Sequence, residues 1–420
     1  MEAPLLPGPL QPPKKASNTV ADAWVLGLMV LLGVGDTVLV AILFWTYNRS
    51  NPMGCDPTAN SSVVGAVPCT YDSNASEDYP IFLNQATGTV YGVVTFPLLA
   101  LWNWMGWNVT HAPGDDGRAK PAPPYRTLVL IGCMNGLGNF CAAVGQVHTG
   151  GTSQALLQLV GIPFVLGLSW IFLYQRPSIT ASVAALAIVG GTALSAVPHS
   201  ENDTNSLWYS NLLFFSAQIF FSGEKVYEEA TFGAYSVDVL WMFLWTLWTQ
   251  VALGWVSWPV QSVPQFGGIN THEIPSLVVD GLRCTAGLPS GPNRPFCDWQ
   301  NPLLFWTYCT VDYSYYAIGL YVIQTRGANL MILAAAISLP LSQLMFCVRA
   351  VGGPDTSKFL WTDAVALVVV LGGFAVFYLV SPEGRRQRLG AHAVGVHDKA
   401  AKAERQPLLI NTEGSVGARR

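Results

Sequence analysis

Apolar runs of about twenty residues with almost no charge recur along this sequence, and about twenty apolar residues are needed to cross a hydrocarbon core of about 30 Å. Only 11% of the 420 residues are charged and 51% are hydrophobic, whereas about 25% are charged in a typical soluble domain. The chain is therefore predicted to be an all-α polytopic membrane protein. Its net charge of −4 is too small to indicate a nucleic-acid partner.

Ten apolar runs are predicted to be transmembrane helices, with both ends of the chain in the cytosol. In chain order they are Ala23–Trp45, Ile81–Trp107, Thr127–Val147, Gly151–Tyr174, Ile179–Val197, Leu207–Val226, Val237–Trp258, Pro302–Ile323, Gly327–Val348 and Trp361–Val380. Of the 21 Lys and Arg residues, all but Arg49, Arg283, Arg294, Arg349 and Lys358 fall on the cytosolic side of this layout. This excess of positive charge on the cytosolic side supports the predicted orientation.

Glycan acceptor sequons mark the opposite side of the membrane. Asn48, Asn60 and Asn74 each begin an Asn-x-Ser/Thr triplet within segment 47–80, and Asn202 begins another after the fifth run. Such sequons are used on surface loops of secreted or lumenal segments. Both segments are therefore predicted to be lumenal, which agrees with the distribution of positive charge.

The lumenal segments also contain cysteines. Cys55 and Cys69 lie in the first lumenal loop, and Cys284 and Cys297 lie in the long connector 259–301. A lumenal compartment permits disulfide formation. Cys55–Cys69 and Cys284–Cys297 are therefore candidate disulfide bonds.

Two stretches share an order of small residues and proline that indicates an internal duplication. Gly150-Gly151-Thr152 is followed by Pro163, and Gly327-Ala328-Asn329 is followed by Pro340. In each case another apolar run with two adjacent glycines comes next. The shared order favours duplication over a chance likeness between two apolar segments.

The duplication predicts two repeats, residues 23–197 and 207–380. Five helices is an odd number, so the two copies cross the membrane in opposite orientations. Inverted repeats of this kind are common in secondary transporters, which bind substrate near the midplane between the halves. Pro163 and Pro340 would each free a backbone carbonyl and are predicted hinges.

Asp36 and Asp312 are the two carboxylates predicted to lie in the middle of membrane spans. A charged group in a span costs at least about 2.5 kcal/mol, so such groups tend to face an aqueous cavity and to have a function. A buried carboxyl is also easier to protonate. Either aspartate is predicted to carry a coupled proton or to face a cationic substrate. The alternative is that each carboxylate accepts hydrogen bonds from neighbouring hydroxyls and amides and has only a structural role.

Further polar and aromatic side chains lie at helical spacing in four spans. Each alone is more often part of an interhelical hydrogen bond than a ligand. Together they predict a polar and aromatic cavity for a small-molecule substrate. The set comprises Asn135, Asn139, Thr152, Gln154, Gln158, Tyr315, Tyr316 and Asn329.

Segments 1–22 and 383–420 are predicted to be cytosolic tails, the first of them disordered. The first lacks the features of a cleaved signal peptide or an organelle transit peptide. In the second, Glu404, Leu408 and Leu409 have the acidic dileucine spacing that cytosolic sorting adaptors recognise.

Several motifs resemble those of one transporter family in the same order. Gln154–Pro163 resembles the fourth-helix motif of the chloroquine-resistance-transporter-like family, in the drug/metabolite transporter superfamily. Glu229–Phe232 and Asp238–Leu240 resemble its link from helix six to helix seven. Glu273–Pro275 resembles the start of its long lumenal loop, and Pro340 fits its ninth helix.

This resemblance extends over residues 126–382 and implies a ten-helix transporter that uses protons to export small solutes from an acidic vacuole or lysosome. It implies substrates among amino acids, small peptides, thiol peptides and organic cations, and no cofactor. The plastid envelope is an alternative location, which the missing transit peptide disfavours.

The chain departs from the family pattern at three points. The family's lumenal loop often holds four cysteines and this one holds two, so only Cys284–Cys297 carries over. Glu228 stands where members usually have a basic residue. Asn135 matches a position that can be Asp, which removes a possible titrating group.

Other functions are less well supported by the sequence. It contains no Walker loop for an ATP-driven pump and no zinc-ligand spacing among its histidines. A membrane-embedded transferase would need a catalytic carboxylate pair, for which 224–229 is the candidate, and we interpret this segment as a solvated helix end. A nucleotide-sugar carrier would need basic residues at its cavity, and no predicted span interior carries Lys or Arg. A receptor or scaffold is disfavoured by the duplication.

Overall fold

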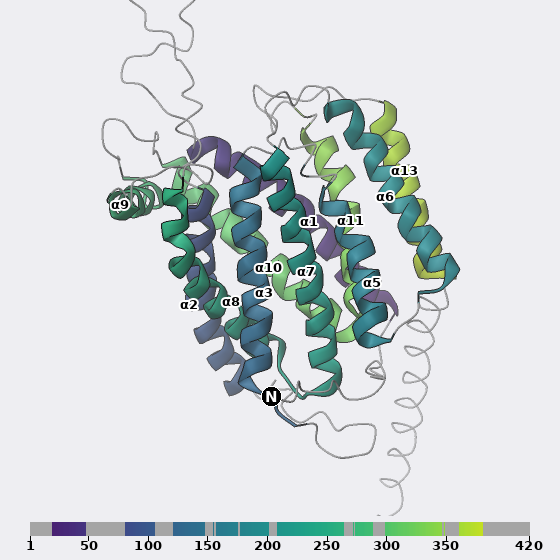
Figure 1. Cartoon of the computed structure of the whole chain (residues 1–420), viewed down its shortest axis with the longest axis horizontal. Coiled ribbons are helices and arrows are strands. Elements are labelled where there is room, and N and C mark those ends of the chain that lie inside the picture. The colour runs from purple at the N-terminus through teal and green to yellow at the C-terminus, as the bar shows by residue number, and fades with distance from the viewer. Residues whose placement is uncertain are drawn as a thin grey trace, which may run out of the picture.

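The computed structural model describes residues 19–47, 80–105, 121–147, 154, 157–174, 177–200, 208–263, 272, 274–288, 299–346, 348 and 361–380. Every regular element in these ranges is a helix (Figure 1). The all-α class predicted from the sequence is therefore confirmed for the described part of the chain.

In chain order, the helices in the described ranges are α1 (Thr19–Tyr47), α2 (Pro80–Trp104), α3 (Tyr125–Val147), α5 (Gly161–Leu173), α6 (Ile179–Ser200), α7 (Trp208–Ala234), α8 (Val239–Ser257), α9 (Ile274–Thr285), α10 (Gln300–Arg326), α11 (Ala328–Phe346) and α13 (Trp361–Val380), with a 3-10 turn η2 (Trp258–Ser262). The links from α7 to α8 and from α10 to α11 are short, whereas longer segments separate most of the other helices. The helix α9 lies in connector 259–301, which was predicted to be a loop.

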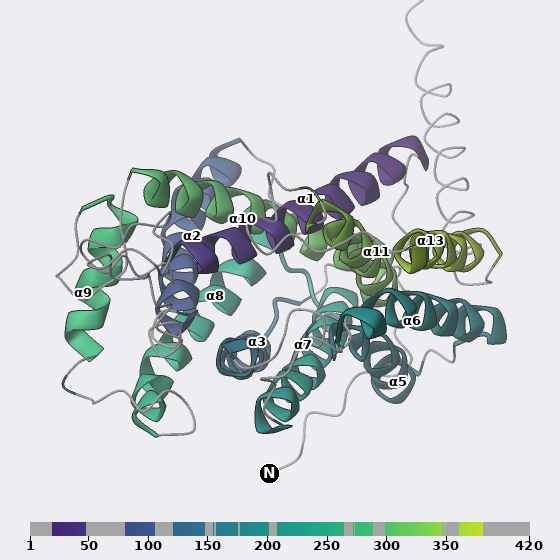
Figure 2. The ribbon, with the colours of Figure 1, turned by 90° about the horizontal axis from the view of Figure 1, so that it is seen from above.

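Most of the helices run side by side, while α9 runs crosswise to them at one edge of the bundle, next to α2 and α10 (Figure 1). Seen from above, α3 and α7 lie near the centre, with α2, α8, α9 and α10 on one side and α5, α6, α11 and α13 on the other (Figure 2). The helix α1 crosses both groups and packs on α10 and α11. Parts of the chain that are far apart in sequence therefore form one bundle.

The packing between helices repeats in a reciprocal way. As α1 packs against α10 and α11, α7 packs against α3 and α5. The helix α2 packs against α8, and α6 packs against α13. The first five helices (α1, α2, α3, α5 and α6) thus correspond in order to five later ones (α7, α8, α10, α11 and α13). Swapping each helix for its counterpart leaves this set of packed helix pairs unchanged.

The two predicted hinge prolines lie in different local structures. Pro340 lies inside the continuous helix α11 and is buried. Pro163 is exposed and lies in the first turn of α5. Backbone N–H groups in that turn have no partner within the helix, so the missing N–H of proline costs no helical hydrogen bond. Span four was predicted as one helix from Gly151. Residues 154 and 157–159 are helical, a turn at Val160 interrupts the helix, and α5 begins at Gly161.

The distribution of some charged and apolar side chains differs from that of a soluble protein. Glu224, Glu228 and Lys225 are buried, although charged residues are almost never fully buried in soluble proteins. Large apolar side chains lie on the outside, as in Leu186 and Val368, which are 73% and 70% exposed. An exposed apolar surface of this kind fits contact with lipid.

Two helical stretches, Tyr125–Gly145 and Val239–Val260, are long and apolar enough to cross a membrane by length and composition. Five shorter apolar helical stretches accompany them in the described residues. Ten membrane spans in two inverted repeats therefore stay a prediction.

Several predicted features lie outside the described residues. They are the tails 1–18 and 381–420 with Glu404, Leu408 and Leu409, the sequons at Asn48, Asn60, Asn74 and Asn202, the residues Cys55, Cys69 and Cys297, and Thr152. Cys284 is buried and is not among the free thiols of the described residues. The predicted pairing of Cys284 with Cys297 stays a prediction.

Candidate functional site: a cavity with four carboxyl groups

A cavity of about 160 Å³ lies among α1, α2, α3, α7, α8 and α10. A cavity of about 150 Å³ is large enough to hold benzene, so this one fits a small solute. Its lining extends from Glu228 on α7 to Leu83 in the first turn of α2 and Ala143 near the end of α3. Two groups of polar side chains face this space.

The first group, here called the aspartate cluster, consists of Asp36, Tyr91, Tyr308 and Asp312, all of which line the cavity. The Tyr91 hydroxyl donates to Asp312 Oδ2 at 2.7 Å. The Asp312 carboxyl also lies close enough to Tyr308 and to the Asp36 carboxyl to interact with them electrostatically. Because two carboxylates this close repel one another, the pair favours sharing a proton or binding a cation.

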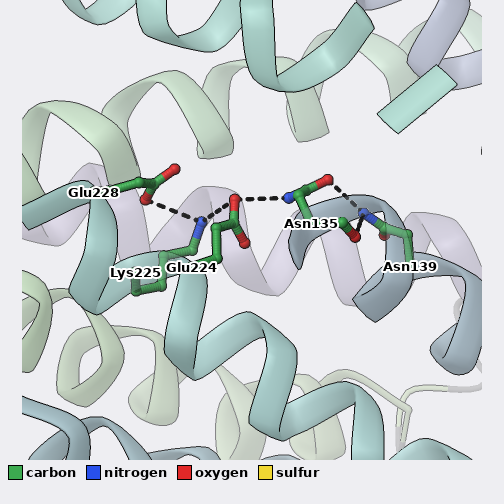
Figure 3. A network of polar contacts seen from close by, with 5 residues as sticks. All are labelled: Asn135, Asn139, Glu224, Lys225 and Glu228. Carbon is green, nitrogen blue, oxygen red and sulfur yellow. Dashed lines mark hydrogen bonds and ion pairs between the residues drawn. The ribbon is translucent and has the colours of Figure 1, made fainter. Parts of the chain in front are cut away.

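The second group, here called the glutamate cluster, consists of Asn135, Asn139, Glu224, Lys225 and Glu228 (Figure 3). Lys225 Nζ lies 3.2 Å from Glu224 Oε1 and 3.5 Å from Glu228 Oε2. Asn135 Nδ2 donates to the same Glu224 oxygen at 2.8 Å, and Asn139 Nδ2 donates to Asn135 Oδ1 at 2.8 Å. The cluster therefore joins α3 to α7 through one chain of polar contacts.

Acidic groups outnumber basic ones around the cavity. Asp36, Asp312, Glu224 and Glu228 contribute four carboxyl groups, and Lys225 is the one cation among the described lining residues. Its ammonium group lies 5.6 Å from the centre of the Tyr316 ring, on the helix that carries Asp312. An acidic cavity with low-dielectric walls attracts cations and disfavours anions.

The glutamate cluster corrects an interpretation made from the sequence. Residues 224–229 were taken as a solvated helix end because span six was predicted to end at Val226. The helix α7 continues to Ala234, and Glu224 and Glu228 are each 1% exposed. Lys225 likewise shows that a bundle interior carries a basic residue, contrary to the prediction.

Five of the predicted cavity residues do line it, namely Asp36, Asn135, Asn139, Asp312 and Tyr316. Four others, Gln154, Gln158, Tyr315 and Asn329, are described but do not line this cavity. The helices α5 and α11, which carry the predicted hinges, pack outside the six that surround it.

Sequence reasoning missed several lining residues. Tyr91 was not singled out because it lies in another span than Asp312. Tyr308, four residues before Asp312, could have been found from helical spacing. The spacing of Glu224, Lys225 and Glu228 was a usable signal, since residues three and four apart lie on one helix face. That face could not be placed inside the bundle without the packing of α3 against α7.

Comparison with known proteins supplies the family. The CRT-like (chloroquine-resistance transporter-like) family model matches residues 59–378. The chain belongs to the CRT-like family. The match begins well before Arg126, where the motif resemblance began, and therefore includes the second apolar run.

Relatives that are 25–27% identical to this chain have names that refer to the same family. "Crt homolog 3" and "Crt homolog 2" of Dictyostelium discoideum are 27% and 25% identical, over 72% and 79% of this chain and 67% and 72% of their own lengths. The "Chloroquine resistance transporter" of Toxoplasma gondii is 26% identical over 71% of this chain, but over only 35% of its own length. These relatives support a membrane transporter role.

A solved structure is similar in fold. It superposes with a TM-score of 0.52 and 15% sequence identity, and the superposition covers 87% of this chain and 99% of the solved chain. At this identity the likeness bears on the fold alone.

Proposed function

We propose that this CRT-like protein is a proton-coupled secondary transporter that moves small cationic or zwitterionic solutes out of an acidic compartment. The observation that carries this proposal is that the Asp36 and Asp312 carboxyls face the same acidic cavity, close enough for their charges to interact. Such a pair takes up a proton from an acidic lumen and releases it to the cytosol, which provides a means of coupling. The proposed solutes are amino acids, small or thiol peptides and organic cations.

The proposed mechanism is alternating access between two inverted repeats, 23–197 and 207–380. The reciprocal packing of the helices supports this, since each contact of α1 has a counterpart made by α7. On the predicted topology, the start of α2 and the end of α3 face the lumen. The cavity reaches toward those ends, as expected for a state that loads solute from the lumen.

The proposed location is the vacuole or lysosome, with the plastid envelope as the alternative. The dileucine pattern at Glu404, Leu408 and Leu409 supports the first through cytosolic sorting adaptors. Glycans at Asn48, Asn60, Asn74 and Asn202, and bridges Cys55–Cys69 and Cys284–Cys297, belong to the same proposal.

The competing functions fit the cavity less well. A nucleotide sugar needs a basic group for its phosphates, and Lys225 is already engaged by two carboxylates. A transferase needs its carboxylate pair at a membrane face, whereas Glu224 and Glu228 are buried between helices.

The test is uptake of amino acids and peptides into vesicles that contain the full-length protein and an imposed pH gradient. We expect Asp312→Asn and Asp36→Asn to lower gradient-driven uptake by about tenfold or more, because each removes a charge-assisted contact from the proton site. Asp238→Asn is the matched control, since Asp238 is as buried as Asp312 but caps α8 outside the cavity.

Unchanged gradient-driven uptake in both aspartate variants would overturn the coupling proposal. Uptake of nucleotide sugars in place of amino acids and peptides would overturn the proposed substrate class.

A further inference from the structure

We propose that Glu224 Oε2 is the acceptor for an ammonium group of the solute, and that this ammonium must carry N–H bonds. The inference rests on the proposed function, since it assigns a role to one residue of the same cavity. The two clusters then have different roles: the aspartate cluster exchanges the proton, and the glutamate cluster binds the solute.

One oxygen of Glu224 is fixed in place. Oε1 accepts from Asn135 Nδ2 at 2.8 Å and lies 3.2 Å from Lys225 Nζ. Asn135 is held in turn by Asn139, whose Nδ2 donates to Asn135 Oδ1 at 2.8 Å and to its backbone oxygen at 3.1 Å. The carboxylate is therefore oriented before any solute arrives, which lowers the entropy lost on binding.

The other oxygen has no donor. Glu224 is 1% exposed, and Oε2 has no hydrogen-bond partner among the described residues. The Glu228 carboxyl lies within range of Glu224, but it supplies a donor only when it carries a proton, and one of its oxygens already pairs with Lys225. A buried anionic acceptor without a donor is unfavourable, and a solute ammonium removes this penalty.

The geometry favours an ammonium with N–H bonds over a quaternary one. Quaternary ammonium groups bind through the faces of aromatic rings. Of the aromatic rings that line the cavity, Tyr316 already has the Lys225 ammonium 5.6 Å from its centre. An unpartnered carboxylate oxygen, in contrast, gains a charge-assisted hydrogen bond only from a donor.

Two small probes separate these possibilities. Ethanolamine carries a primary ammonium and choline carries a quaternary one, while both have the same hydroxyethyl group. Binding to purified full-length protein is measured by the concentration dependence of thermal stabilisation, without a pH gradient. We expect ethanolamine to bind about tenfold or more tightly than choline.

The decisive variant is Glu224→Gln, which we expect to weaken ethanolamine binding by about tenfold or more. Asp238→Asn is the matched control, because it removes a buried carboxylate that caps α8 outside the cavity and leaves the glutamate cluster intact; we expect a change within about threefold. If Glu224→Gln does not give a folded protein, the ratio of ethanolamine to choline affinity in the wild type still decides.

Equal or tighter binding of choline would overturn the assignment, as would no stabilisation by ethanolamine or no effect of Glu224→Gln. Because no gradient is applied, these outcomes leave the coupling proposal standing. Failure of that proposal would appear instead as unchanged gradient-driven uptake in the aspartate variants.

Discussion

The aspartate cluster and the glutamate cluster share one cavity but differ in how their charge is compensated. In the glutamate cluster two carboxylates flank Lys225, and Asn135 donates to one of them. In the aspartate cluster the donors are tyrosine hydroxyls, and no Lys or Arg is among its members. The glutamate cluster thus contains its own cation, whereas the aspartate cluster can gain positive charge only by taking up a proton.

This difference indicates which cluster is needed for folding and which for coupling. Removing the cation from a compensated buried cluster leaves charges unpaired and is strongly destabilising. An uncompensated carboxyl pair is already unfavourable, a feature that proteins retain at functional sites at the expense of stability. The three predictions below test this comparison from the largest expected effect to the smallest.

The first prediction concerns the internal cation. Lys225→Met leaves Glu224 and Glu228 buried without their shared counter-ion, and we expect it to lower the free energy of unfolding by about 3–5 kcal/mol. The measurement is denaturation of the purified protein in detergent. Arg283→Met, at an exposed position in α9, is the control and should change stability by about 0.5 kcal/mol or less. Equal stabilities for the two variants would contradict the view that Lys225 holds the glutamate cluster together.

The second prediction concerns the donors to the aspartates. Tyr91→Phe removes a hydrogen bond to a carboxyl, and we expect a loss of stability of about 1.5–3 kcal/mol. Tyr313→Phe is the matched control, since the Tyr313 ring packs edge-on against Tyr91. Among the described residues its hydroxyl bonds the neutral Thr95, so we expect a loss of stability of about 0.5–1.5 kcal/mol. Both are measured by the same denaturation. Equal losses would indicate that Asp312 accepts this bond as a neutral carboxyl.

The third prediction concerns the amide that orients the glutamate cluster from α3. Asn139→Ala removes two neutral hydrogen bonds to Asn135 and should lower the free energy of unfolding by about 1 kcal/mol. Because Asn135 then holds Glu224 less firmly, ethanolamine binding should also weaken by a few fold. Denaturation measures the first effect, and the concentration dependence of thermal stabilisation by ethanolamine measures the second. A loss as large as that of Lys225→Met would mean that the amides, and not the ammonium, compensate the glutamates.

The sequence by itself determined the class of the protein and much of its helical content. Runs of about twenty apolar residues allow little besides helices in a membrane, since every backbone polar group must be satisfied within the segment. Trp361–Val380 was predicted with the bounds of α13, and α3 begins two residues before its prediction. The same logic found Asp36 and Asp312, because a charge inside an apolar run stands out in the sequence.

Only the tertiary structure decided which polar residues meet. Gln154 and Asn329 looked equivalent to Asn135 in spacing, but α5 and α11 lie outside the six helices around the cavity. Glu224 and Lys225 looked like a solvated end, but the extension of α7 and its packing on α3 bury them. Helical spacing determines which residues share a face, whereas the packing of neighbouring helices determines whether that face meets lipid, protein or cavity.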